Sequence, residues 1–231
     1  QIIASNCHEQ SLRQGSMSMS VESIVIATDL NKTFKAEQKG LDDVQALQGI
    51  NMQIKAGQLT ALVGPDGAGK TTFLRLIAGL YEPTTGSLKV LGMDVAKDPQ
   101  SVQDRISYMP QKFGLYEDLS IQENLDLYAD LHGVPMDVRK ERFERLLKIT
   151  DLARFTERPA GKLSGGMKQK LGLACTLVRS PELLLLDEPS VGVDPLSRRD
   201  LWIIIEQLVR EENLSVILST CLLYTSDAAD E

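Results

Sequence analysis

The stretch QLTALVGPDGAGKTT, residues 58–72, decides the fold. Its first half is a short apolar run that ends at a glycine, which is typical of a strand buried on both faces. Its second half fits the pattern G-x-x-x-x-G-K-[ST] from Gly64 to Thr71. This pattern is informative when a strand precedes it and a helix follows it. We therefore expect a strand, a phosphate-binding loop and a helix over residues 70–80 in direct succession; a glycine-rich turn without a ligand is the alternative.

The residue types in this loop suit a nucleoside triphosphate. Glycines let backbone N–H groups wrap around a phosphate, and the helix N-terminus adds its positive dipole end. Lys70 supplies a point charge for the β- and γ-phosphates, and Thr71 offers a hydroxyl to Mg²⁺. Asp66 must point outward, because its carboxylate would repel phosphate. The predicted nucleotide-binding residues of the loop are Gly64, Pro65, Asp66, Gly67, Ala68, Gly69, Lys70, Thr71 and Thr72.

The composition excludes several classes of protein. The 231 residues carry 25 Lys and Arg against 32 Asp and Glu, a net charge of −7, and 42% are hydrophobic. Such a chain can bury a core, but it is too acidic to hold bare nucleic acid through counterion release. Three cysteines and two histidines, with no C-x-x-C pair, favour neither a disulfide framework nor a zinc site. The apolar runs are also far shorter than the about 20 residues that cross a bilayer.

Strand-like and helix-like segments alternate along the chain, which predicts an α/β fold. The segments SIVIATDL and LQGINMQI, residues 23–30 and 47–54, have the character of strands. Residues 121–180 instead carry apolar positions at helical spacing with capping signals, which predicts an inserted helical subdomain.

Two terminal segments are set apart from the fold. The first 20 residues begin without methionine and are rich in Ser and Gln, which indicates a disordered or non-native lead. The last eleven, CLLYTSDAADE, resemble a sequencing adapter translated in frame, so native sequence is expected to end at Thr220. A genuine, unusual tail is the alternative.

A second motif, LLLLDEP at residues 183–189, predicts a buried parallel strand. The carboxyl end of such a strand faces the ligand crevice of an α/β sheet, where Asp187 would hold Mg²⁺. Glu188 is then a candidate base for the attacking water. An N-cap or exposed turn residue is the alternative for Asp187.

A third motif, LSGGMKQK, places Ser164 as the N-cap of a helix that Gly165 and Gly166 open. A helix N-terminus of this kind can bind another face of a phosphate. Taken alone the string is weak, and an ordinary helix start explains it.

These motifs, in this order, resemble the ATP-binding cassette (ABC) ATPases from Val21 to Thr220. The segment YMPQKFGLYEDLSIQENL resembles the family's Q-loop region with Gln111, and SVGVDP resembles its D-loop with Asp194. Phe34, in LNKTF, resembles the aromatic that stacks on adenine, although a core aromatic fits as well. For Asp194, capping a helix that begins at Pro195 is a sufficient structural reason.

The resemblance implies an α/β P-loop NTPase fold: a RecA-like core with an antiparallel β subdomain, plus an inserted α-helical subdomain. It implies Glu188, Lys70 and Gln111 as catalytic residues, with Thr71, Gln111 and Asp187 on Mg²⁺. Two cassettes would pair head to tail around two ATP molecules, so that Ser164, Gly165, Gly166 and Asp194 act on the partner's nucleotide. The expected divisions are 1–20 lead, 21–114 core and β subdomain, 115–179 helical subdomain, 180–220 return to the core, and 221–231 tail.

More narrowly, the sequence is similar to the ATP-binding subunits of bacterial ABC-2 type, multidrug-efflux-like exporters, especially the first cassette of tandem subunits. This similarity implies a second cassette, a separate membrane permease, a periplasmic adaptor protein, and a peripheral location on the cytoplasmic face of the inner membrane. The permease is expected to dock on a helical segment around FGLYEDLS, residues 113–120, with Tyr116 and Leu119 as apolar contacts. Internal packing of those two side chains is the alternative.

The sequence departs from the family pattern at two positions. Met167 stands where the family's signature motif usually has Gln, a change that this subfamily tolerates. The departure that bears on activity is the absence of the switch histidine expected after Thr220, where Cys221 of the adapter-like tail stands instead. We therefore expect this chain to bind nucleotide weakly and to hydrolyse it poorly. The rival functions are a catalytically weak or truncated regulatory cassette and a soluble ABC-type translation factor.

Overall fold

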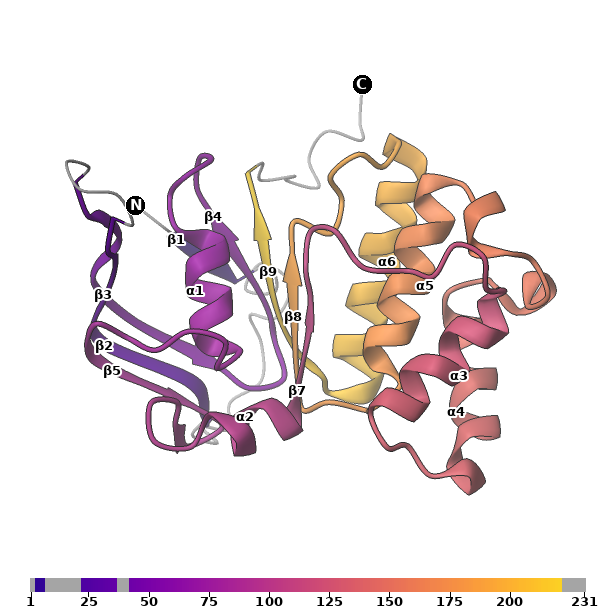
Figure 1. The fold of residues 1–231 in the computed structure, drawn as a ribbon, viewed down its shortest axis with the longest axis horizontal. Coiled ribbons are helices and arrows are strands. Elements are labelled where there is room, and N and C mark those ends of the chain that lie inside the picture. The colour runs from indigo at the N-terminus through magenta and orange to yellow at the C-terminus, as the bar shows by residue number, and fades with distance from the viewer. Residues whose placement is uncertain (1–2, 7–21, 37–41, 222–231) are drawn as a thin grey trace, which may run out of the picture. The chain divides into compact units, whose positions relative to one another are not determined.

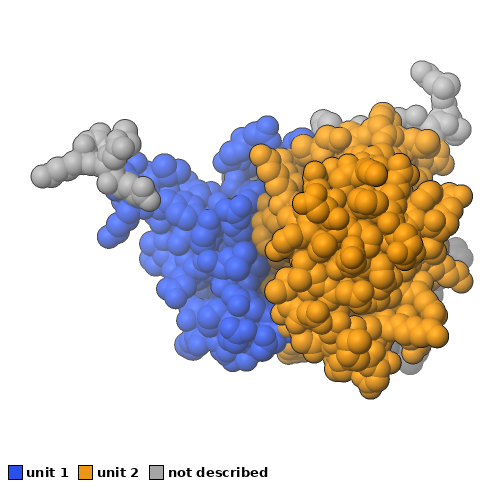
Figure 2. Space-filling model, turned by 45° about the vertical axis from the view of Figure 1, so that its right-hand side comes forward, with its two compact units in different colours: residues 1–104, 217–231 blue, residues 105–216 orange. Residues whose placement is uncertain are grey.

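The computed structural model describes residues 3–6, 22–36 and 42–221. The chain divides into two compact units, which Figure 2 shows in blue and orange. Unit 1 comprises residues 1–104 and 217–231, and unit 2 comprises residues 105–216. The predicted helical stretch 121–180 falls within unit 2.

Unit 1 contains an antiparallel sheet in the strand order β3-β2-β5-β6. Its strands are β2 (Ser23–Phe34), β3 (Val44–Lys55), β5 (Thr85–Val90) and β6 (Met93–Asp94). Both strands predicted in this region, over 23–30 and 47–54, are confirmed, and each extends to 12 residues. This sheet matches the antiparallel β subdomain that the resemblance implied.

The phosphate-binding loop of unit 1 lies between β4 (Leu59–Val63) and α1 (Lys70–Ile77). Most of α2 (Pro99–Arg105) and of β9 (Ser215–Thr220), which neighbours β4, also belongs to this unit. Helix α1 packs against β3 and β5 (Figure 1). It stops three residues short of the predicted end because Gly79 takes the left-handed conformation, with φ +65°, that commonly terminates a helix.

The N-terminal lead was expected to be disordered or non-native, and the first of these alternatives is wrong for residues 3–6. Strand β1 (Ile3–Asn6) pairs antiparallel with β4, with Ile3 opposite Val63. The edge of β4 offers a row of backbone N–H and C=O groups that a further strand can satisfy, which explains the pairing. The other residues of the lead, 1–2 and 7–20, and residues 222–231 of the adapter-like tail lie outside the described residues.

Unit 2 combines a parallel strand pair with a layer of helices. Strand β7 (Ile106–Met109) runs parallel to β8 (Leu183–Asp187), and all five residues of β8 are buried, as predicted. Helix α5 (Gly165–Leu177) contacts α3 (Ile121–Leu131), α4 (Met136–Ile149) and α6 (Pro195–Glu212) (Figure 1). Two short 3₁₀ turns, η1 (Ala153–Phe155) and η2 (Ala160–Lys162), connect α4 to α5.

Residues 113–120 were predicted to be helical, but they form a loop. Ser120 ends this loop as the N-cap of α3, where it forms a capping box with Glu123. A capping box satisfies the first N–H groups of a helix and so fixes where the helix begins. The helix therefore starts at Ile121, and residues 113–120 remain outside it as a loop.

The core of unit 2 follows the predicted apolar spacing. Leu201, Ile204, Ile205 and Leu208 are buried along one face of α6. Cys175 is fully buried on α5, which confirms it as a small core residue. Across the ranges that the structure describes, no helix is both long enough and apolar enough to cross a membrane.

Candidate functional site

The loop after β4 has the backbone that its glycines require. Gly67 and Gly69 take φ angles of +77° and +92°, which L side chains rarely adopt. A Cβ at Gly69 would also lie 2.6 Å from the carbonyl oxygen of Ala46, so this position excludes any side chain. Asp66 is exposed, as predicted.

Lys70 lies at the junction of the loop and helix α1. Its side chain is buried, and its Nζ donates to the carbonyl oxygens of Gly64 at 2.8 Å and Pro65 at 3.1 Å. The N-cap of α1 is Gly69, which provides no side-chain hydrogen bond, and the first turn contains no acidic residue. The first N–H groups of a helix carry partial positive charge and attract anions. A buried ammonium beside such a helix end fits the phosphates of a nucleotide.

Phe34 lies at the end of β2 within a small aromatic and cationic cluster of unit 1. Its ring is half-buried and makes an edge contact with Tyr81 at a centroid distance of 5.4 Å. The ammonium of Lys32 lies 5.1 Å from the Phe34 centroid and 5.6 Å from that of Tyr81. These contacts would be the same for an aromatic residue that only packs on the sheet. The stacking of Phe34 on adenine therefore stays a prediction.

Unit 2 holds the two carboxylates of the LLLLDEP motif. Asp187 ends β8 and is only 2% exposed, and its Oδ2 accepts a hydrogen bond from the Tyr108 hydroxyl at 3.0 Å. Glu188 follows with φ +48°, a left-handed conformation that is uncommon for residues other than glycine. Gln111 donates from Nε2 to Glu188 Oε2 at 3.4 Å, so these two predicted catalytic residues meet.

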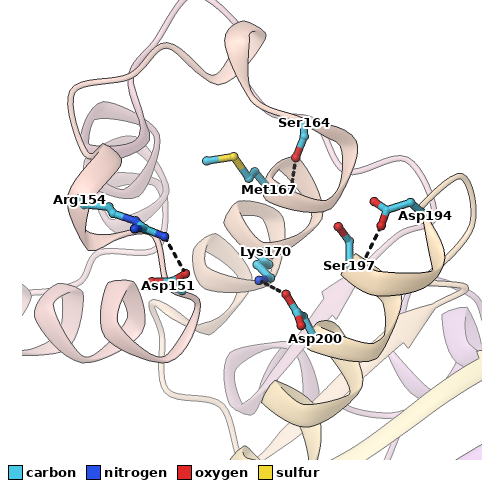
Figure 3. A network of polar contacts seen from close by, with 8 residues as sticks. All are labelled: Asp151, Arg154, Ser164, Met167, Lys170, Asp194, Ser197 and Asp200. Carbon is cyan, nitrogen blue, oxygen red and sulfur yellow. Dashed lines mark hydrogen bonds and ion pairs between the residues drawn. The ribbon is translucent and has the colours of Figure 1, made fainter. Parts of the chain in front are cut away.

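The starts of α5 and α6 lie side by side in unit 2 (Figure 3). Ser164 caps α5 by accepting from the Met167 N–H, and Asp194 caps α6 by accepting from the Ser197 N–H at 2.9 Å. The Ser197 hydrogen bond lowers the pKa of the exposed Asp194 carboxyl. Both caps were predicted. A Cβ at Gly166 would lie 2.3 Å from Ser197 Oγ, so the two helices approach to a distance that only glycine allows.

A cleft of about 290 Å³ opens in unit 2. It is lined by the start of α5, by residues 191–193, and by five residues of the preceding loop: Gln111, Lys112, Phe113, Leu115 and Glu117. Tyr116, a predicted permease contact, is 53% exposed, and Leu119 is half-buried; neither lines the cleft. The two residues thus lie on the loop that borders the cleft, and their docking role stays a prediction.

Two polar residues of unit 2 were missed by the sequence analysis. Tyr108 contacts Asp187 from 79 positions away, and Asn124 is fully buried beneath the loop before α3. The only signal for Tyr108 was its place in a strand parallel to the LLLLDEP strand. A buried asparagine has no sequence signature, because any amphipathic helix carries polar residues.

Comparison with known proteins identifies the family of this chain. Residues 47–191 match the ABC transporter family. The probable multidrug ABC transporter ATP-binding protein YbhF of Escherichia coli is 52% identical over 202 residues, which cover 87% of this chain and 34% of YbhF. The bacitracin transport ATP-binding protein BcrA of Bacillus licheniformis is 34% identical over 203 residues, covering 88% of this chain and 63% of BcrA. The chain therefore spans about a third of the length of YbhF.

A solved structure gives the same result at the level of the fold. A dimeric ATP-binding cassette in a post-hydrolysis state, bound to ADP and Pi, matches with a TM-score of 0.72 and 26% identity. The match covers 85% of this chain and 87% of the other. The predicted P-loop NTPase fold is thereby confirmed. The chain belongs to the ABC transporter family, as one of its ATP-binding cassettes.

Proposed function

We propose that this chain is the ATP-binding and ATP-hydrolysing motor of an ABC exporter. Closure of two cassettes and hydrolysis of ATP would drive substrate through a separate membrane permease. Support comes from the family match and from relatives whose names specify multidrug and bacitracin transport. The same names favour an exporter over a soluble translation factor.

The observation that carries this proposal is the start of α1. Lys70 is buried there with its ammonium on two loop carbonyls, and the N-cap residue Gly69 supplies no side-chain hydrogen bond to the helix. An anion with several oxygens can accept from both the helix N–H groups and the lysine ammonium. The β- and γ-phosphates of ATP have this chemistry.

Each unit would contribute its own groups to hydrolysis. In unit 1, Lys70 neutralises charge on the phosphates and Thr71 offers its hydroxyl to the cation. In unit 2, Glu188 polarises the attacking water, and Gln111, which already donates to Glu188, senses the γ-phosphate. Ser164, Gly165 and Gly166 would act on the nucleotide of a partner cassette, with the α5 N-terminus as the positive group.

The residues present also fit Mg²⁺. The proposed ligands Thr71, Gln111 and Asp187 are a hydroxyl, an amide oxygen and a carboxylate, and Mg²⁺ prefers such oxygen ligands. Asp187 is held by the Tyr108 hydroxyl, and ligating carboxylates commonly have such support. When bound, the cation neutralises charge that develops on the phosphate oxygens.

The proposed partners rest on the resemblance to ABC-2 type exporters. They are a second cassette, an ABC-2 type permease and an adaptor protein in the periplasm. This chain itself would lie at the cytoplasmic face of the bacterial inner membrane. The cleft beside residues 111–117, with its apolar Phe113 and Leu115, and the exposed Tyr116 on the same loop offer apolar surface for a permease segment.

Phosphate release by the purified chain tests the enzymatic role. Replacing Glu188 with glutamine should lower kcat by about 100-fold or more, because general bases contribute about 10²–10⁴ to rate. Binding of a fluorescent ATP analogue should persist in that variant. Glu206→Gln removes the same charge from an exposed position of α6 and should retain the rate of the unaltered chain. Equal turnover in the Glu188→Gln variant would contradict the proposed base and favour a silent cassette.

Nucleotide binding is tested separately at Lys70. Lys70→Ala should abolish binding of the fluorescent analogue. Residues 64–72 carry two charged side chains, the exposed Asp66 and the buried Lys70. Of these, Lys70 alone has the positive charge that attracts phosphate. Undiminished binding in this variant would remove the basis for an ATP site at the start of α1.

A further inference from the structure

The hydroxyl of Tyr108 and the carboxylate of Asp187 form a hydrogen bond that joins the start of the Q-loop segment to the end of the LLLLDEP strand. Tyr108 Oη donates to Asp187 Oδ2 at 3.0 Å. Asp187 is 2% exposed and Tyr108 is half-buried, so water competes little for this bond. A hydrogen bond to an ionised group is about twice as strong as one between neutral groups.

The strand register explains how two residues so far apart in sequence meet. In the parallel pair of β7 and β8, Tyr108 lies opposite Leu185. Side chains two positions apart on a strand point to the same face. Tyr108, Leu185 and Asp187 therefore share one face of the pair, and the tyrosine ring reaches along the strand direction to the carboxylate at the end of β8.

We propose that Tyr108 is a positioning residue for Asp187: its hydroxyl fixes the rotation of the carboxylate that is to hold Mg²⁺. This inference rests on the proposed function, because it needs Asp187 to be a cation ligand. Tyr108 itself would not touch the cation.

The chemistry of the pair supports this role over simple packing. The two oxygens of a carboxylate accept about four hydrogen bonds in total, so the Tyr108 bond leaves Asp187 able to accept others or to ligate a cation. The donor is carried on a rigid ring held in β7, so the bond restricts the rotation of the carboxylate. Phenylalanine would fill the same space without the donor.

The test uses the full chain with Mg²⁺ and a fluorescent ATP analogue as probes. Binding of the analogue is measured against increasing Mg²⁺ and, separately, in excess chelator. In Tyr108→Phe, the Mg²⁺ concentration that gives half-maximal enhancement should rise about 10-fold or more, as is typical when the support of a metal ligand is removed. Binding in chelator should equal that of the unaltered chain.

Tyr128→Phe is the matched control. Tyr128 also donates its hydroxyl, to the Gly114 carbonyl oxygen at 2.8 Å, but it does not contact Asp187 or Glu188. It loses the same chemical group and should leave the Mg²⁺ dependence unchanged. Denaturant unfolding of both variants verifies that the comparison is made on folded protein.

A double-mutant cycle with Asp187→Asn separates positioning from a general structural effect. If Tyr108 acts through Asp187, Tyr108→Phe should change the Mg²⁺ dependence no further in the Asp187→Asn background. An unchanged Mg²⁺ dependence in Tyr108→Phe overturns this inference and leaves the proposed function intact. Absence of ATP binding by the unaltered chain overturns both.

Discussion

Replacing Asn124 with alanine measures how firmly the loop before α3 is held. The Asn124 side chain is 0% exposed, and it bonds only to backbone groups of that loop in the contacts described here. Its Oδ1 accepts from the Tyr116 N–H at 3.0 Å. Its Nδ2 donates to the carbonyl oxygens of Tyr116, Leu119 and Ser120 at 3.0, 3.2 and 2.9 Å.

These contacts set the expected cost. An amide group has two donor hydrogens, so the three donated contacts amount to two full hydrogen bonds plus the accepted one. At a net value of about 1 kcal/mol each, their loss should lower the free energy of unfolding by about 3 kcal/mol. The Leu119 and Ser120 carbonyl oxygens keep their backbone donors, the N–H groups of Ala160 and of residue 124, which keeps the cost from rising far above this figure.

Urea unfolding followed by circular dichroism is the assay. Asn124→Ala should lower the midpoint with an unchanged slope, because the compactness of the folded state is preserved. Gln122→Ala, on the same helix, removes a single part-buried hydrogen bond to Asp126 and should lower the free energy of unfolding by less than about 1 kcal/mol. A loss below about 1 kcal/mol in Asn124→Ala would refute the claim that this side chain holds the loop.

Two further predictions concern packing and pH. Gly166→Ala places a Cβ 2.3 Å from Ser197 Oγ, so it should lower the free energy of unfolding in urea by about 1–3 kcal/mol. The control is Gly165→Ala, whose Cβ would have its nearest neighbour at 3.7 Å and which should be nearly neutral. Equal effects of the two variants would contradict the packing argument. Arg105 donates two hydrogen bonds of 2.6 Å to Glu182 and holds the pKa of Glu182 below its ordinary value of 4.5. The stabilisation from this pair is therefore complete above pH 4.5 and is lost as pH falls through the lowered pKa. Because the Glu182 side chain is 52% exposed, the deficit of Glu182→Gln at neutral pH should be at most about 1 kcal/mol, and it should vanish in acid; a deficit that persists at low pH would rule out the ion pair as its cause.

Local signals in the sequence predicted the elements that carry the proposed chemistry. The strand over 183–187 followed from its apolar run, and the starts of α5 and α6 followed from Ser164 and from Asp194 with Pro195. Caps and buried runs act over a few residues, so one segment of sequence contains the whole cause.

Features that depend on distant partners were not predicted. The loop over residues 113–120 was expected to be helical, and the Asn124 side chain that holds it is polar without any local pattern. Likewise, β1 exists because β4 offers it an edge, and Tyr108 meets Asp187 only through strand register. Sequence spacing carries no information on such pairings until the topology is known.

The contact between Gly166 and Ser197 has a consequence for how this sequence can evolve. The α5 start carries the signature motif, and the α6 start follows the Asp194 loop, so one small residue in each element limits the other. A larger residue at position 166 becomes acceptable only when position 197 loses its side chain. The two positions should therefore co-vary among descendants of this chain, with the sum of their side-chain volumes held nearly constant.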